Sequence, residues 1–308
     1  MNSQDIKNAI SGVLVVDKPV GMTSHDVVQA IRNGTGLRRA GHTGTLDPRA
    51  SGVLVILVGP AVRLSEYVSA SDKRYQAIIR LGAKTDTFDA DGKFTQSNQP
   101  INITEQQFEE VLKTFIGEIE QTPPPYSAVK VQGRKAYEMA RKGEEVDLAP
   151  RKITVHHLEV LEWAPPEVVI DVHCSSGTYV RSLANDLGEK LGCGAYLVGL
   201  RRTKSGRFSL RDAVPLRKLQ EAFQAGNWYQ YLIPAAEALA DWPAIELNPD
   251  EVEGVRHGHR VKAEADTPVG KRVRGVSTQG ELVALLECVI DEDGAPAWQP
   301  KKVFFTSD

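Results

Sequence analysis

The sequence has few of the residues that would place it in several common protein classes. Its 308 residues include three widely spaced cysteines, Cys174, Cys193 and Cys288, and no Cys-x-x-Cys pair. We therefore expect neither a disulfide framework nor a cysteine-based zinc site. The longest apolar run, near residues 53–58, is too short to span a bilayer, and the polar start lacks the apolar stretch of a signal peptide. These absences predict a cytoplasmic protein without a membrane segment.

An excess of positive charge is also missing. Lys and Arg number 37 against 40 Asp and Glu, which gives a net charge of −3. This balance excludes a globally basic nucleic-acid coat protein but not a local basic face. Two stretches, 126–142 and 199–217, do concentrate basic residues, and the first also carries Tyr126 and Tyr137. Such a mixture suits contact with phosphates and bases, although a merely solvated charged face has the same composition.

The pattern of elements changes near Trp242. Residues 1–245 have a net charge of +1 and mix strand-like and helix-like segments, which predicts an α+β domain. Residues 246–308 have a net charge of −4 and contain short β-type runs (271–276, 282–289 and 301–305) separated by Gly, Asp and Pro. This pattern predicts a small all-β domain at the C-terminus.

Three local signals in the larger domain are clear. Residues 73–82 alternate between apolar and polar positions, which predicts a half-buried strand. Thr104 and Gln107 form a capping-box pattern ahead of a helix. Apolar residues recur at helical spacing over 180–191, and Gly192 is expected to end that helix.

The segment Gly41–Gly52 is the most unusual in the chain. Its three glycines allow a ligand to approach the backbone closely. No Gly-Lys-Ser/Thr follows, so the segment is not a phosphate-binding P-loop. Asp47 precedes Pro48, which favours an extended backbone at the aspartate. Taken alone, Asp47 could equally cap a turn.

Two further residues allow both a structural and a functional interpretation. Arg181 falls in the first turn of its helix, where a cation opposes the helix dipole. It is either an exposed arginine tolerated at small cost or the partner of a carboxylate elsewhere. Tyr75 is either a core tyrosine or a pocket residue that stacks on a planar ring.

Two patterns resemble metal sites, but the positions of their residues do not fit one. The acidic segment Asp86–Gly92 resembles a calcium loop, but its ligand positions and its glycine do not line up. His156 and His157 are adjacent on an expected strand, so they should point to opposite faces and not share a metal. The sequence therefore predicts no metal site.

Six segments carry a resemblance to a known family: Asp17–Ser24, Gly41–Pro48, Lys73–Tyr75, Pro123–Lys130, Gly177–Arg181 and Leu200–Arg202. In this order and at this spacing they closely resemble the bacterial tRNA pseudouridine synthase B (TruB) family. The resemblance implies a pseudouridine-synthase fold, with a central mixed, mainly antiparallel sheet flanked by helices. It assigns residues 1–245 to the catalytic domain, including a basic RNA-gripping insertion at about 123–152. Residues 246–308 resemble a PUA domain, a small β-barrel-like RNA-binding module.

The activity implied by the resemblance is isomerisation of uridine 55 in the T arm of tRNA to pseudouridine. No atoms are gained or lost, so no cofactor is expected. The resemblance makes Asp47 the catalytic carboxylate, which attacks the sugar, attacks the base or removes the 2′ proton of the sugar. Each of these acts requires an ionised Asp47. Burial would raise its pKa and a nearby arginine would lower it, and Arg181 is the implied partner.

The resemblance also implies a set of substrate-binding side chains: His42, Tyr75, Tyr179, Arg181, Leu200, Lys18 and Lys130. Tyr75 would stack on the target base, Leu200 would complete an apolar wall, and His42 would stabilise the opened arm. Lys18 and Lys130 would contact phosphates. The target base must leave the folded arm to reach the aspartate. The only partner expected is tRNA, bound by a monomer without an obligatory protein partner.

Two other functions are open to the same sequence. The chain could bind or fold RNA without catalysis, with the Asp47 loop in a structural role. It could also be a glycoside-type hydrolase in which Asp47 acts with Asp86 or Asp89 as a carboxylate pair.

Overall fold

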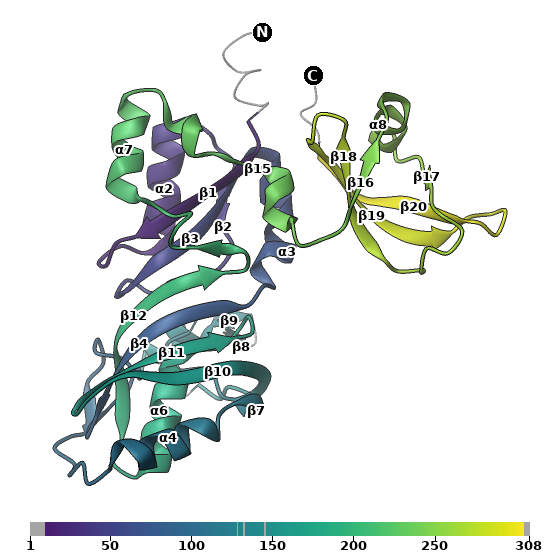
Figure 1. Cartoon of the computed structure of the whole chain (residues 1–308). Helices are drawn as coiled ribbons and strands as arrows, with labels where there is room; N and C mark the ends of the chain where they lie inside the picture. The colour runs from purple at the N-terminus through teal and green to yellow at the C-terminus, as the bar shows by residue number, and fades with distance from the viewer. Residues whose placement is uncertain (1–9, 128, 132, 145, 305–308) are drawn as a thin grey trace. The chain divides into compact units, whose positions relative to one another are not determined.

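The computed structural model describes residues 10–304 apart from 128, 132 and 145, and the chain forms two compact units. Unit 1 comprises Met1–Pro48, Leu54–Ser69 and Arg207–Asp308, and unit 2 comprises Arg49–Val53 and Ala70–Gly206. Helices and mainly antiparallel strands are mixed along the chain, as predicted for the α+β class (Figure 1). Strand β3 (Ala50–Val58) contributes residues to both units.

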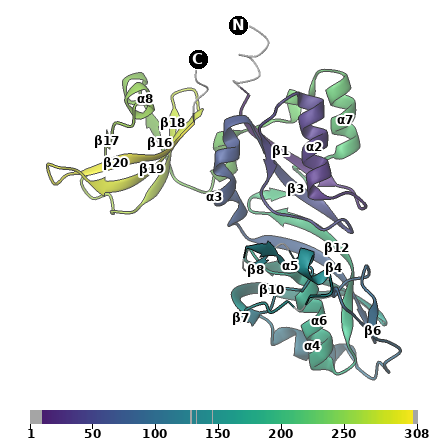
Figure 2. The same ribbon diagram turned by 180° about the vertical axis from the view of Figure 1, so that it is seen from behind.

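In unit 1 the strand β1 (Gly12–Lys18) lies between β3 and β14 (Val214–Pro215). Helices α2 (Ser24–Thr35) and α7 (Leu216–Gln224) lie side by side, as both ribbon views show (Figures 1 and 2). The smaller elements of this part are β2 (Ala40–His42), η1 (Gly59–Leu64), α3 (Ser65–Ser69), β13 (Phe208–Ser209), η2 (Trp228–Tyr231), β15 (Ile233–Pro234) and η3 (Ala235–Leu239).

The C-terminal part of unit 1 is a five-stranded sheet with one helix. The strands are β16 (Ala244–Leu247), β18 (Arg272–Ser277), β19 (Leu282–Ile290), β20 (Pro296–Val303) and β17 (Val261–Lys262), in that spatial order. Leu247, Val273 and Trp298 are among the buried residues of its own apolar core.

The prediction of a purely β segment is wrong in one respect, because helix α8 (Pro249–Arg256) packs on this sheet. A capping box formed by Asn248 and Glu251 starts this helix, and a proline occupies its first turn. The last strand also begins earlier than the predicted run 301–305, because Pro296 pairs with the end of β19. Residue 305 lies outside the described residues.

Unit 2 is built on an antiparallel sheet. Its strands are, in spatial order, β12 (Ala195–Ser205), β4 (Lys73–Leu81), β11 (Glu167–Cys174), β10 (Arg151–Ala164) and β7 (Gly117–Gln121). Residues of β4 are alternately buried and exposed, which confirms the predicted two-sided strand. The start of β3 adds a parallel partner to β12, with Ala50 opposite Leu200.

Two helices of unit 2 pack on one side of the sheet (Figure 1), and one end of each lies where the sequence predicts it. Helix α4 (Glu105–Lys113) begins with the predicted capping box between Thr104 and Gln107. Helix α6 (Val180–Leu191) ends at Gly192, which adopts a left-handed backbone with a φ of 73°. The remaining elements are β5 (Lys84–Thr85), β6 (Phe94–Gln96), β8 (Lys130–Val131), β9 (Arg134–Lys135) and α5 (Ala136–Ala140).

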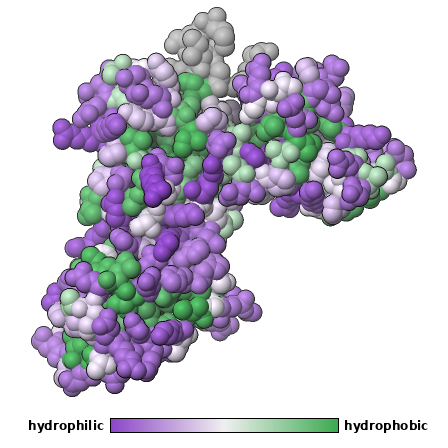
Figure 3. All heavy atoms as spheres, in the orientation of Figure 1, coloured by the Kyte–Doolittle hydropathy of each residue, from purple (hydrophilic) through white to green (hydrophobic). Residues whose placement is uncertain are grey.

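The face drawn in Figure 3 is mostly hydrophilic, with apolar side chains in separate groups. The three cysteines are buried and form no disulfide. Within the described residues, no helix has the length and apolar character needed to cross a bilayer.

Candidate active site

The loop that carries Asp47 lies between β2 and β3, and hydrogen bonds hold it on both sides of that residue. The Ser24 hydroxyl donates to the carbonyl oxygen of Leu46 (2.9 Å) and accepts from the Leu46 N–H (2.8 Å). The Gly21 N–H donates to the carbonyl oxygen of Pro48 (2.8 Å). Asp47 itself is half-buried. Two separate segments singled out by the resemblance are therefore joined, and together they fix the backbone around the carboxylate.

Lys18 belongs to the same arrangement, in a role that differs from the predicted one. Its side chain is completely buried, at 0% exposure. The ammonium donates to the carbonyl oxygens of Met22 (2.6 Å), Pro19 (2.9 Å) and Pro48 (3.4 Å). A buried charge needs such partners, and here they come from both segments of the site. The arrangement gives no support to a phosphate contact by Lys18, because the ammonium points into the protein.

His42 is the last residue of β2 and is half-buried. It stands opposite Ile56 of β3, and the next residue, Thr43, donates its N–H to the carbonyl oxygen of Val55 (3.1 Å). The position of His42 is therefore fixed by a strand pair of unit 1, five residues before Asp47.

Tyr75 and Leu200 share a face of the unit 2 sheet. Tyr75 is 8% exposed on the buried face of β4, two residues before Ala77. Leu200 of β12 pairs with Ala77 on one side and with Ala50 of β3 on the other. Residues that pair directly across a ladder point to the same face, so Leu200 and Tyr75 lie on one side. In the sequence, Asp47 stands three residues before Ala50.

Arg181 is buried and pairs with a carboxylate. Its side chain is 9% exposed, and its Nη1 lies 3.3 Å from Oδ2 of Asp89, whose side chain is 15% exposed. Its Nη2 donates to the carbonyl oxygen of Tyr126 (3.1 Å). The interpretation of Arg181 as an exposed, tolerated arginine is therefore wrong, and the interpretation as a carboxylate partner is confirmed through Asp89. The implied pair with Asp47 stays a prediction.

Asp89 is the partner of Arg181, a role that the sequence did not predict. The sequence named Asp89 only within the segment that resembles a calcium loop and as one of two possible hydrolase partners of Asp47. Its Oδ1 accepts from the Thr87 hydroxyl (2.5 Å) and from the Asp91 N–H (3.0 Å). The backbone on either side bonds to Leu197 of β12 through the Phe88 carbonyl and the Ala90 N–H (3.0 Å each). These contacts hold the Asp89 carboxylate in place beside the Arg181 guanidinium.

Tyr179 is held at the start of α6 by a buried amide. Gln121 accepts the Tyr179 N–H (2.8 Å) and donates to the Tyr179 carbonyl oxygen (3.0 Å). The guanidinium of Arg151 lies over the tyrosine ring, 4.6 Å from its centroid, and donates to the Gly177 carbonyl oxygen (2.6 Å). Tyr179 is half-buried, so part of the residue remains accessible to solvent.

Comparison with known proteins decides the family. Residues 32–180 match the family described as TruB family pseudouridylate synthase (N terminal domain). Residues 181–240 match the tRNA pseudouridylate synthase B C-terminal domain. The chain belongs to the TruB family of pseudouridylate synthases.

Individual TruB proteins are similar over most of this chain. The protein named tRNA pseudouridine synthase B from Thiobacillus denitrificans is 44% identical over 260 residues, which cover 84% of this chain and 87% of the relative. The protein of the same name from Syntrophotalea carbinolica is 43% identical over 249 residues, 81% of each chain. The predicted family and enzyme class are thereby confirmed.

Solved structures confirm the fold of this TruB chain. One is described as an H/ACA RNP bound to a substrate RNA containing 2′-deoxyuridine. It superimposes with a TM-score of 0.74 at 28% identity, covering 98% of this chain and 86% of the other. A Cbf5-Nop10-Gar1 complex gives the same TM-score and identity, with 99% of this chain and 88% of the other covered.

Part of the predicted basic insertion of this TruB chain is a hairpin followed by a short helix. Strands β8 and β9 pair, and α5 follows directly. The Ala136 N–H donates to the Val129 carbonyl oxygen (2.8 Å), and Arg134 pairs with Glu144 (2.7 Å). Lys130 is exposed on β8, so it is accessible to solvent. A phosphate contact by Lys130 stays a prediction.

Burial changes the pKa of two side chains beside Tyr75. Lys73 stands two residues before Tyr75 on the buried face of β4, opposite Cys174 of β11. Burial, and then the charge of Arg202, lowers the pKa of the Lys73 ammonium to about 8. Burial raises the pKa of the Cys174 thiol to about 11, so Cys174 is a neutral core residue and not a nucleophile.

Three side chains of types that can bind a metal lie close together on the face of the sheet opposite Tyr75. Asp72, His156 and His173 offer one ligand atom each, all within 4.8 Å of one another. The sequence did not find this group, because its members are scattered over about a hundred positions.

Proposed function

We propose that this chain isomerises uridine 55 in the T arm of tRNA to pseudouridine, with Asp47 as the catalytic carboxylate. One observation carries the assignment of Asp47: the residues on both sides of it are tied by hydrogen bonds to the segment 17–24. A reacting group must be held in a defined geometry to contribute to the rate. The buried ammonium of Lys18 adds a further tie at Pro48. We assign Lys18 a positioning role and not a phosphate contact.

The reaction exchanges one bond to the sugar for another. The bond from the base nitrogen to the anomeric carbon breaks, and carbon 5 of the same base bonds to that carbon. The proton on carbon 5 leaves, and the released nitrogen takes up a proton. Atoms and electrons balance without a redox or group-carrier cofactor. Asp47 attacks the sugar, attacks the base or removes the 2′ proton, and each act uses the ionised carboxylate.

The proposal also gives three side chains of unit 2 a role in the reaction. The target base leaves the stack at a cost of about a few kcal/mol and meets the face that carries Tyr75 and Leu200. Tyr75 stacks on the base, and Leu200 supplies an apolar wall. Arg181 supplies positive charge that favours the ionised form of an adjacent carboxylate. The pair with Asp89 keeps the buried guanidinium compensated before tRNA binds.

Recognition of the RNA involves further parts of the chain. His42 stabilises the opened arm, Tyr179 contacts the substrate, and Lys130 contacts a phosphate. We propose residues 1–245 as the catalytic domain and residues 246–308 as a PUA-like RNA-binding domain. The separate apolar core of the C-terminal sheet supports this division. We also propose that the enzyme acts in the cytoplasm, as a monomer, on its tRNA substrate.

The decisive experiment incubates unmodified tRNA transcript with the wild type, Asp47→Asn and Asp86→Asn, and then maps nucleosides. Asp86→Asn is the matched control, because one carboxylate oxygen of Asp86 accepts the Lys93 N–H within its own loop (2.8 Å). We expect conversion by the wild type and by Asp86→Asn, and none by Asp47→Asn at unchanged tRNA affinity. Conversion by Asp47→Asn at a near wild-type rate would show that Asp47 is not the catalytic group.

The same experiment separates the two alternative functions. An RNA-binding module without catalysis predicts tight, salt-sensitive tRNA binding and no conversion by the wild type. A hydrolase predicts free uracil in the wild-type product, and loss of its release in Asp86→Asn where Asp86 is the second carboxylate. Retention of all base in the RNA, with a carbodiimide-dependent primer-extension stop at position 55, would exclude both as the sole function.

A further inference from the structure

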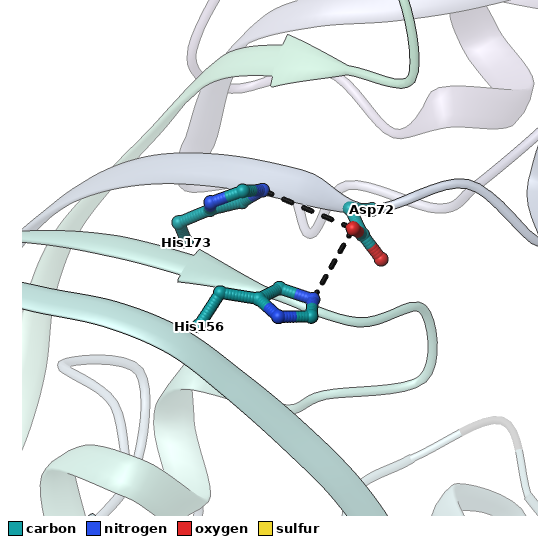
Figure 4. A group of neighbouring side chains, drawn as sticks. All are labelled: Asp72, His156 and His173. Atoms are coloured by element: carbon teal, nitrogen blue, oxygen red, sulfur yellow. Dashed lines mark ion pairs between the residues drawn. The ribbon is translucent and has the colours of Figure 1, made fainter. Parts of the chain in front are cut away.

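Three side chains that the proposed reaction does not use meet on the outer face of unit 2. Oδ2 of Asp72 lies 3.2 Å from Nε2 of His156 and 3.9 Å from Nε2 of His173. The two imidazole rings have their centroids 4.8 Å apart at an interplanar angle of 49°. Figure 4 shows both rings turned toward the carboxylate, each from a different strand. The three ligand atoms all lie within 4.8 Å of one another.

The strand register explains why these distant residues meet. His173 of β11 pairs with Arg74 of β4, and Asp72 stands two residues before Arg74, so both project from the face opposite Tyr75. The Gly206 N–H donates to the Asp72 carbonyl oxygen (2.8 Å) and fixes the backbone there.

A β-bulge brings in the third residue. In β10, Val155 pairs with Cys174 and His157 pairs with His173, so His156 is the extra residue of the ladder. An extra residue of this kind changes the direction of a side chain relative to simple alternation. His157 instead lies beside Glu159, with 3.3 Å between Nε2 and Oε2. His156 therefore contacts Asp72 and His173, which come from other segments, and not its sequence neighbour His157.

We propose that Asp72, His156 and His173 bind a borderline divalent cation of the Zn²⁺ type. Two imidazole nitrogens and one carboxylate oxygen form a donor set that suits zinc, whereas Mg²⁺ and Ca²⁺ prefer oxygen alone. Tetrahedral zinc with bonds of about 2.0–2.2 Å places its ligand atoms about 3.4 Å apart. The observed separations of 3.2 and 3.9 Å from the carboxylate come close to that value.

The surroundings of the group fit a site that keeps contact with water. The three side chains are between 36% and 49% exposed, so they can rotate slightly to close on an ion, and water can complete its coordination. Two cations, Arg74 and Lys204, lie close to His173. Asp171 compensates Arg74, because its two carboxylate oxygens each accept from the Arg74 Nε (2.9 Å). Such a metal would tie β10, β11 and the start of β4 together.

The test is metal binding to the intact chain after chelator treatment and dialysis. Zn²⁺ is titrated calorimetrically, and Co²⁺ is used as a spectroscopic probe of the ligand geometry. The variants are His156→Gln, His173→Gln and Asp72→Asn, with His157→Gln as the matched control on the same strand. Circular dichroism checks that each variant is folded, which these exposed positions should allow.

We expect one equivalent of Zn²⁺ to bind to the wild type and to His157→Gln. Each of the other three variants should bind it at least about tenfold more weakly, because one of three protein ligands is lost. The Co²⁺ complex of the wild type should show the visible absorption of a tetrahedral or five-coordinate ion. Absence of saturable binding to the wild type, or unchanged affinity in all three ligand variants, would overturn the proposal.

Discussion

Replacing Asp89 by asparagine tests the most buried ion pair of the proposed site. The change removes the negative charge that faces Arg181 at 3.3 Å but keeps the size of the side chain. Oδ1 of the new amide can still accept from the Thr87 hydroxyl and the Asp91 N–H, as the carboxylate does. The Arg181 guanidinium would retain the Tyr126 carbonyl oxygen as a partner while losing its carboxylate. Asp89→Asn therefore changes mainly the charge beside Arg181 and leaves the other contacts of the side chain in place.

The burial of the pair sets the expected magnitude. The Arg181 and Asp89 side chains are 9% and 15% exposed, so solvent screens little of their interaction. Breaking a buried pair by removing one partner costs about 3–5 kcal/mol, because a charge is left uncompensated. The hydrogen bonds that asparagine retains reduce this to about 2–4 kcal/mol. At about 2–4 °C per kcal/mol for a chain of this size, the melting temperature should fall by about 4–16 °C.

The assay compares thermal unfolding of the wild type, Asp89→Asn, Arg181→Met and the double variant. A double-mutant cycle should give a coupling energy of about 1–3 kcal/mol between the two positions. Asp91→Asn is the matched control, because Asp91 pairs with Arg49 at the surface, with both side chains about half exposed. This control should unfold near the wild-type temperature. Equal melting temperatures for Asp89→Asn and Asp91→Asn would refute the reasoning.

Two further predictions concern buried polar groups of unit 2. Gln121→Leu removes both hydrogen bonds to the Tyr179 backbone and should cost about 2–3 kcal/mol of unfolding free energy, measured in urea, with Gln106→Leu as the exposed control. Lys73 has a folded-state pKa of about 8, below its ordinary 10.5, so the unfolded chain binds more protons between these values and stability rises with pH across that window. Lys73→Met loses this dependence. The wild type should therefore gain about 2–3 kcal/mol relative to the variant between pH 7 and pH 10, and parallel stability profiles would contradict the shifted pKa.

The ends of a helix can be predicted from the sequence where the residues that determine them are close neighbours in the chain. The capping box of α4 and the glycine that ends α6 involve residues within about four positions, so one segment contains the whole signal. Alternation along β4 is equally local, because the strand period places successive side chains on opposite faces. Helix α8 carries a similar start signal at Asn248, but its eight residues provide too few turns for a periodic apolar pattern.

The contacts that define the site are not local, and their partners follow from strand register instead. The helix-dipole argument left open whether Arg181 is exposed or has a carboxylate partner, and the observed partner lies 92 residues earlier, beside a bridge to β12. The burial of Lys18 has no sequence signal either, since lysine is almost never fully buried without partners. Its partners are backbone carbonyls, which every residue carries, so no side-chain pattern marks them. The bulge at His156 has no sequence signal either. The one extra residue in β10 sets the direction of the His156 imidazole and therefore its contacts.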